Sequence, residues 1–172
     1  MAPGARRRPS STARCASHPP PSPERPECTV TDDRPATARL LDLEQHPEGG
    51  WFRRMWTGTV AVETPAGVRP AATCIHYLLT PGEHSAWHVV TSDELWLWHG
   101  PGRLELSFGG DGISPELTDA VVLGADLAAG ERLQATVPAG VWQAARLVDD
   151  AECVVSCLVS PGFSFEDWRL AD

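Results

Sequence analysis

Turn-forming residues recur along this chain at short, regular intervals from residue 49 onward, and this spacing constrains the fold more than any other feature. Between the turns lie short runs rich in β-branched and aromatic residues. Strand-like runs spaced about 8–12 residues apart are typical of β-sandwiches and β-barrels. The sequence therefore predicts strands over residues 51–62, 71–79, 84–90, 93–99, 103–108, 119–124, 132–137, 141–148 and 152–160.

Helical patterning is confined to the segment from Ala36 to Gln45 and to residues 125–129 and 164–168. Alternation along the strands then predicts which side chains share a face. Glu94 and Trp96 point to one side of their strand, and His84 and His88 share a face of the preceding one. Both faces of these strands carry apolar residues, which indicates a closed barrel with a lined interior. We predict an all-β fold with little helix.

The head of the chain differs in composition from the body. Residues 1–35 contain eight of the sixteen prolines and no Trp, Phe, Tyr, Leu or Ile. Such a segment buries too little apolar surface to offset its ordering entropy. We therefore predict a disordered tail over residues 1–35, or an over-long gene model, and one folded domain over residues 36–172.

Charge and composition exclude several classes of partner. The chain carries a formal net charge of −9, and its fourteen basic residues are all arginine. An acidic surface argues against nucleic acid or an anionic membrane as a partner, and the absence of lysine excludes Schiff-base chemistry. No apolar run reaches the length of about eighteen residues that a membrane span needs. The cysteines lack disulfide or zinc spacing and favour a reducing, cytoplasmic location.

Four stretches of the sequence carry a resemblance to a known family. The segment LLTPGEHSAWHVVTSDELWLWHGPG resembles the first cupin motif, and GERLQATVPAGVWQAARL resembles the second. Together with LEQHPEGGWFRR and the terminal SPGFSFEDW, they resemble a cupin family of largely uncharacterised function, grouped with the dTDP-sugar epimerase-like cupins. The resemblance covers about residues 40–172. It implies a cupin-type jelly-roll β-barrel with an open mouth, and a homodimer.

His88 and Glu94 are the candidate catalytic residues, because the first cupin motif places a histidine and a glutamate at these positions. An imidazole titrates near neutrality and can move a proton or bind a metal. A carboxylate beside it can fix its tautomer or complete a metal site. Metal-binding cupins offer further histidines, but here Val90 and Gln143 stand at two of those positions. Any divalent metal would thus rely on His88, Glu94 and Gln143, with His84 as a second imidazole; no cofactor is assigned.

Candidate ligand contacts surround these two residues in the motifs. Tryptophan faces suit stacking on a ring, an arginine suits an anionic group, and the HPEGG turn brings polar groups to the barrel mouth. By parity only one of the adjacent Arg53 and Arg54 faces inward. The candidates are His46, Glu48, Trp51, Arg53, His84, Trp96, Trp142 and Gln143.

Three functions fit these residues, and all take a small molecule as ligand. The first is an epimerase-like or isomerase-like enzyme acting on a sugar, sugar nucleotide or related keto metabolite, with His88 as proton-transfer base oriented by Glu94. The second is a metal-dependent cupin oxygenase or isomerase. The third is a cupin that binds its ligand without catalysis. Fold alone does not decide among them.

Overall fold

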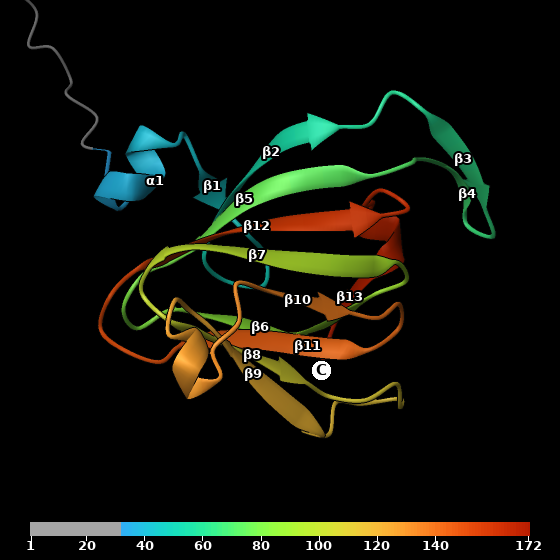
Figure 1. The fold of residues 1–172 in the computed structure, drawn as a ribbon. Coiled ribbons are helices and arrows are strands. Elements are labelled where there is room, and N and C mark those ends of the chain that lie inside the picture. Colours follow the sequence, from blue (N-terminus) through green and yellow to red (C-terminus); the bar gives the residue numbers. More distant parts are fainter. Residues whose placement is uncertain (1–31) are drawn as a thin grey trace, which may run out of the picture. The chain divides into compact units, whose positions relative to one another are not determined.

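Two antiparallel β-sheets face each other in the computed structural model, which describes residues 32–172 (Figure 1). The six-stranded sheet has the order β1 (Glu44–Gln45), β2 (Trp51–Thr57), β5 (Thr73–Leu79), β12 (Cys153–Ser160), β7 (Asp93–Pro101) and β10 (Gln134–Val137). The five-stranded sheet has the order β13 (Trp168–Leu170), β6 (His84–Val90), β11 (Trp142–Leu147), β8 (Leu104–Phe108) and β9 (Asp119–Leu123).

The remaining elements are short. A two-stranded ribbon of β3 (Ala61–Thr64) and β4 (Gly67–Pro70) projects from the barrel in Figure 1. The helices are α1 (Ala36–Leu40) and the 3-10 turns η1 (Leu127–Ala129) and η2 (Phe165–Asp167). None of the described helices is long and apolar enough to cross a membrane. The predicted all-β fold with little helix is confirmed.

Some predicted boundaries are wrong in detail. The run 51–62 is divided, because Gly58 leaves the sheet after β2 and its amide bonds the carbonyl of Ala72. The segment 164–168 contains only one 3-10 turn before β13 adds to the edge of β6. Neither interruption shows in the apolar pattern, because both depend on partners that lie far away in the sequence.

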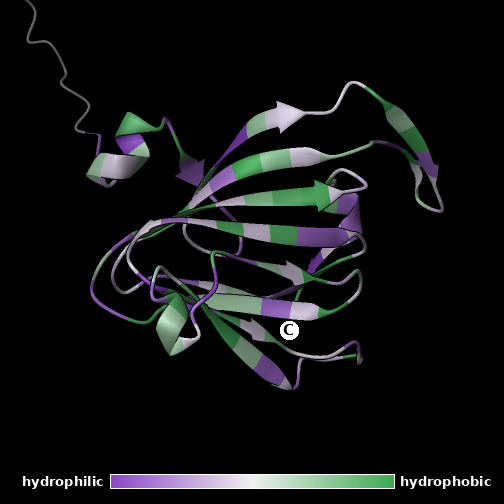
Figure 2. Ribbon diagram, in the orientation of Figure 1, coloured by the Kyte–Doolittle hydropathy of each residue, from purple (hydrophilic) through white to green (hydrophobic). Residues whose placement is uncertain are grey.

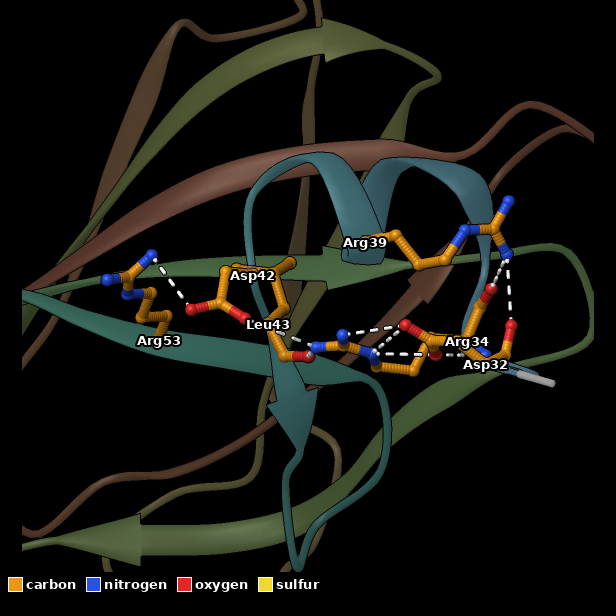
Figure 3. A network of polar contacts seen from close by, with 6 residues as sticks. All are labelled: Asp32, Arg34, Arg39, Asp42, Leu43 and Arg53. Atoms are coloured by element: carbon orange, nitrogen blue, oxygen red, sulfur yellow. Dashed lines mark hydrogen bonds and ion pairs between the residues drawn. The ribbon is translucent and has the colours of Figure 1, made fainter. Parts of the chain in front are cut away.

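The start of the domain is fastened by polar contacts at its surface (Figure 3). Arg34 pairs with Asp32 at 2.7 Å and donates to the carbonyl of Leu43 at 2.9 Å. Arg53 on β2 pairs with Asp42 at 3.3 Å. The predicted disordered tail lies outside the described residues up to residue 31, whereas its last four residues belong to the described unit and join this network.

The interior of the barrel is divided along the strands into two ends. At one end, Leu79 pairs with Cys153, and Leu104 pairs with Leu123; all four side chains are fully buried in one apolar cluster. Figure 2 shows the corresponding alternation of apolar and polar bands along the strands. This end is a packed core, typical of an antiparallel barrel whose inward residues are apolar.

At the other end the same strands carry different side chains. Val159 of β12 pairs with Glu94 of β7, and Gln143 of β11 pairs with His88 of β6. Glu94, His88 and Gln143 are all buried. The fold thus gathers the buried carboxyl groups of Glu48 and Glu94 and the imidazole of His88 at this end of the barrel, which is the candidate site.

Candidate functional site

A pocket opens into the polar end of the barrel. Its cavity volume is about 30 Å³, so the pocket is narrow. Apolar side chains from β2, β5, β6, β12 and the C-terminal segment form its walls. Its polar lining consists of His46, Glu48, Arg54, Thr73, Tyr77, His88 and Glu94.

The HPEGG turn brings His46 and Glu48 into this pocket. The amide of Gly49 donates to the His46 carbonyl, and the His46 amide donates to the Gly50 carbonyl, both at 3.0 Å. Gly49 has φ +108°, and a Cβ there would lie 2.2 Å from the His84 carbonyl oxygen. Only glycine fits a left-handed conformation pressed against another backbone segment in this way. The turn therefore fixes Glu48 beside β6.

The polar contacts in the pocket centre on the carboxyl group of Glu48. Its Oε1 accepts from Ser85 Oγ at 3.0 Å, and its Oε2 accepts from Trp168 Nε1 at 3.3 Å. The same Oε2 lies 3.3 Å from His88 Nδ1 and 3.4 Å from His46 Nδ1. Burial raises the pKa of the Glu48 carboxyl to about 7. Glu48 therefore stands between two imidazoles and exchanges its own proton near neutral pH.

A β-bulge in β6 determines which residues of this strand lie beside Glu48. Gln143 of β11 pairs with His88, but Ala145 pairs with Ser85, so one residue of β11 faces two of β6. Such a bulge shifts the alternation of the strand by one residue. Ser85 and His88 therefore both point inward, and His84 is exposed. Strict alternation places His84 beside His88, and the bulge removes it.

The ring orientation of His88 follows from its contacts. Nδ1 lies 2.9 Å from the Ala86 carbonyl oxygen, which can only accept, so we assign the proton of the neutral ring to Nδ1. Burial lowers the pKa of His88, while Glu94 and the Ala86 carbonyl act in the opposite direction. A neutral ring with this tautomer leaves the lone pair of Nε2 free. His88 thus presents a base to the pocket.

His46 has the opposite tautomer and an aromatic surround. Its Nδ1 accepts a hydrogen bond from the amide of Glu48 at 3.3 Å. Burial lowers its pKa to about 4, with a smaller contribution from repulsion between the His46 and His88 rings when both are protonated. The Phe52 ring meets it edge-on at 4.5 Å between centroids, and Phe165 stacks at 6.0 Å. His46 therefore stays neutral at neutral pH and holds the wall of the pocket.

Glu94 belongs to a second chain of hydrogen bonds. Gln143 Nε2 donates to Glu94 Oε2 at 2.5 Å, and Trp96 Nε1 donates to Gln143 Oε1 at 2.9 Å. Burial raises the pKa of Glu94, opposed by the charge of His88. The sequence predicts that Glu94 orients His88, whereas the contacts of Nδ1 are a hydrogen bond with the Ala86 carbonyl and a close approach to the Glu48 carboxylate. Glu94 instead faces the pocket as a second titratable group.

The predicted metal ligands do not fit a divalent ion. The Gln143 amide donates to Glu94 and its oxygen accepts from Trp96, so the amide already serves both partners. Within residues 32–172, no three His, Cys, Asp or Glu side chains are arranged to hold a metal. His84 cannot supply a second imidazole because it faces away. We therefore derive no step through a metal.

Several predicted ligand contacts lie outside the pocket. Trp142 is buried on the outer side of the five-stranded sheet, where its Nε1 donates to the Gly112 carbonyl at 3.0 Å and Arg169 covers its ring at 4.7 Å. Its neighbour Gln143 points inward, so alternation excludes Trp142 from the same site. Trp51 lies on the outer side of β2, where its Nε1 donates to Glu83 at 2.9 Å.

Of the two adjacent arginines, Arg54 lines the pocket and Arg53 pairs with Asp42 at the surface. Trp96 lies beneath the pocket, 5.8 Å from the Tyr77 ring. Three residues that the sequence analysis does not select also belong to the site: Ser85, Tyr77 and Trp168. Alternation along β5 is the sequence signal that could have identified Tyr77. Ser85 reaches the site only because of the bulge in β6, and Trp168 reaches it only because the C-terminal segment returns to the barrel.

Comparisons with known proteins identify a family for this chain and agree with its fold. A model of the family described as Cupin superfamily (DUF985) matches residues 36–171. A hypothetical protein from Leishmania major is 32% identical, with a TM-score of 0.70 over 77% of this chain and 83% of that chain. A protein from Shewanella oneidensis is 38% identical, with a TM-score of 0.70 over 78% and 81% of the two chains.

An oxalate decarboxylase from Bacillus subtilis is 16% identical, with a TM-score of 0.52 over 76% of this chain and 30% of that chain. At this identity the likeness shows the fold alone. The comparison with curated proteins yields no match.

Proposed function

Since the chain belongs to the cupin superfamily, in the DUF985 family, we propose that it is a small-molecule enzyme of the epimerase or isomerase type. The observation that carries this proposal is the state of His88. Its Nδ1–H is anchored on the Ala86 carbonyl and faces Glu48, which leaves Nε2 free as a base in an enclosed pocket. A positioned base of this kind suits removal of a proton from carbon next to a carbonyl group.

The proposed reaction begins when His88 Nε2 takes a proton from the carbon α to the substrate carbonyl. The C–H bonding pair moves into the carbon framework and gives an enolate. The imidazolium that forms keeps its Nδ1–H toward Ala86 and Glu48, and the Glu48 carboxylate offsets the new positive charge. When the enolate carries a hydroxyl group on its α-carbon, return of the proton from Nε2 to the former carbonyl carbon, with transfer of the hydroxyl proton to the former carbonyl oxygen, completes an isomerisation. Epimerisation requires that the enolate turn its other face toward Nε2 before the proton returns to the α-carbon.

Glu94 is placed to assist at the carbonyl oxygen. Its Oε2 is held by Gln143, and its raised pKa makes its carboxyl more ready to carry a proton that it can share with an enolate. Tyr77 is not assigned as the acid, because its hydroxyl donates to the Gly49 carbonyl at 2.7 Å. Tyr77 instead ties β5 to the HPEGG turn.

Deuterium exchange tests this proposal. In D₂O, we expect the protein to catalyse exchange of the α-hydrogens of a small keto compound, with hydroxyacetone and pyruvate as first probes, followed by proton NMR. His88→Gln should slow the exchange by about 100-fold or more, as expected for loss of a general base. His84→Gln, an exposed histidine on the same strand, is the matched control and should keep the wild-type rate.

Equal rates for His88→Gln and wild type, with native circular dichroism spectra for both, would remove His88 from the mechanism. A probe that binds in the pocket without exchanging its hydrogens would favour the non-catalytic ligand-binding cupin instead.

A further inference from the structure

Arg54 stands at the mouth of the pocket. It follows Phe52 on the inward side of β2 and pairs with Ile75 of β5, and all three residues line the cavity. The Arg54 guanidinium lies 5.9 Å from the centroid of the Phe163 ring, which belongs to the C-terminal segment on the other side of the mouth. Arg54 is an exposed residue that also lines the cavity, so an incoming molecule can reach it from solvent.

The charge of Arg54 has no counterpart in the described part of the chain. Five of the nine arginines in residues 32–172 form ion pairs with carboxylates, namely Arg34, Arg53, Arg69, Arg103 and Arg146, whereas Arg54 is among the four that do not, and it is the one that lines the pocket. The two carboxyl groups of the pocket are already engaged, Glu48 with Ser85 and Trp168, and Glu94 with Gln143. Partial burial lowers the pKa of Arg54, in keeping with a guanidinium that is desolvated without a carboxylate beside it.

The surroundings of Arg54 favour the binding of an anion at this position over the rest of the surface. The chain carries a net charge of −9, so most of its surface repels an anion. Arg54 is the permanently cationic side chain among the lining residues of the pocket. A guanidinium presents parallel N–H groups that match the two oxygens of a carboxylate or phosphoryl group. The narrow interior then admits a small molecule more readily than a nucleotide sugar.

We propose that the pocket takes a small molecule bearing an oxyanionic group, a carboxylate or a phosphoryl group, and that Arg54 holds this group at the mouth. The opposite end of the molecule then lies toward His88 and Glu94. This inference rests on the proposed function for the role of His88, but anion binding by Arg54 can be measured without catalysis. It narrows the substrate class to small hydroxy or keto acids and their phosphorylated counterparts.

Matched ligands test the inference. Lactate and lactamide have the same shape but differ in charge, and inorganic phosphate represents the phosphoryl group. Binding of each is followed by an NMR titration of the Arg54 Nε–H and the His88 ring signals. We expect an oxyanion to bind and lactamide not to bind. Preference for lactate identifies a carboxylate as the natural group, and preference for phosphate identifies a phosphoryl group.

Substitutions at two neighbouring arginines distinguish anion binding in the pocket from anion binding at the surface. Arg54→Gln should weaken oxyanion binding by about tenfold or more, as expected for loss of a charge-assisted pair. Arg53→Gln removes the same charge from the outer face of the same strand and should change binding less than about twofold. The inference is overturned by wild-type affinity in Arg54→Gln, by equal binding of lactamide, or by an absence of oxyanion binding to the wild type.

The two proposals fail separately. Deuterium exchange from neutral hydroxyacetone, without any Arg54-dependent oxyanion binding, would overturn this inference and leave the proposed function standing. Oxyanion binding that depends on Arg54, without exchange from any probe, would support this inference and overturn the proton-transfer function.

Discussion

The two ends of the barrel interior are built by the same strands and yet differ in chemistry. β5 supplies Leu79 to the packed end and Thr73 to the pocket, and β12 supplies Cys153 and Val159 in the same way. The packed end buries aliphatic side chains that need no partner. The pocket end buries groups whose charged forms are costly to remove from water, so each is held by hydrogen bonds.

The boundary between the ends is a layer of aromatic and amide groups. Trp96 donates to Gln143, and Gln143 donates to Glu94, so this layer faces the core on one side and the pocket on the other. Tyr77 lies 5.8 Å from the Trp96 ring and reaches the HPEGG turn through its hydroxyl. We therefore expect the packed end to contribute most of the apolar burial, and the proposed chemistry lies at the end where the polar groups are buried.

The largest effect on stability should come from the packed end. Leu104 is fully buried, and Leu104→Ala should lower the free energy of unfolding by about 2–5 kcal/mol, because it removes apolar contacts and leaves a cavity. Urea unfolding measures the loss. Oxyanion binding by the folded fraction should stay at the wild-type level. Weaker binding by folded Leu104→Ala would mean that the two ends are not independent.

A smaller effect is expected from the turn that builds the pocket, where two glycines offer a matched pair. Gly49 and Gly82 both have positive φ, but a Cβ at Gly82 meets nothing within 4 Å, whereas at Gly49 it meets the His84 carbonyl. Gly82→Ala should cost about 1–2 kcal/mol for its backbone conformation alone. Gly49→Ala should cost about 3 kcal/mol, because overpacking adds to the strain.

Gly49→Ala should also displace Glu48 and abolish deuterium exchange, which Gly82→Ala should leave intact. Thermal unfolding and the exchange assay measure the two consequences. Equal stability losses for the two variants would show that the close approach of Gly49 to β6 does not constrain the turn.

The third effect depends on pH and concerns the buried carboxyl. The pKa of Glu48 is raised from 4.5 to about 7, so its contribution to stability is full below pH 4.5 and is lost as the pH rises through 7. Glu48→Gln has no such group. The stability of the wild type relative to Glu48→Gln should therefore fall between pH 5 and pH 8, by the order of 2 kcal/mol.

The titration of other groups around Glu48 does not reverse the direction of this change in stability with pH. His46, His88 and Glu94 titrate in both proteins, so the comparison isolates the carboxyl to first order. The lowered pKa of His46 makes its contribution fall as the pH drops below 6.5 toward 4, in wild type and variant alike. Urea midpoints across pH 5–8 check the trend, with Glu44→Gln, an exposed glutamate on β1, as control. A pH-independent difference would contradict the buried position of Glu48.

The sequence was sufficient for the architecture because strand spacing and alternation are local properties. Alternation correctly turned Glu94 and Trp96 inward. It failed for His84, since the bulge in β6 shifts the strand by one residue and brings Ser85 inward instead. Alternation also implies that Trp142 and Gln143, which are neighbours on one strand, cannot both face the barrel interior. Local pattern carries no signal for a bulge.

The partners within the site could not be read from the sequence for a different reason. Glu48 meets Ser85 and Trp168 across 37 and 120 residues, respectively, and these contacts depend on the complete barrel. The cupin motif names His88 and Glu94, but not the carboxyl that faces the histidine. The pairing of His88 with Glu48 is a property of the tertiary structure.

The state of the His88 ring tests the central claim most directly. In ¹⁵N-histidine-labelled protein, NMR distinguishes the two neutral tautomers and the imidazolium at each pH. We predict that His88 at pH 7 is neutral, with its proton on Nδ1, and that only the Nε2 signal shifts strongly when a pocket ligand binds. A proton on Nε2, or an imidazolium at pH 7, would contradict the assignment of His88 as a free base.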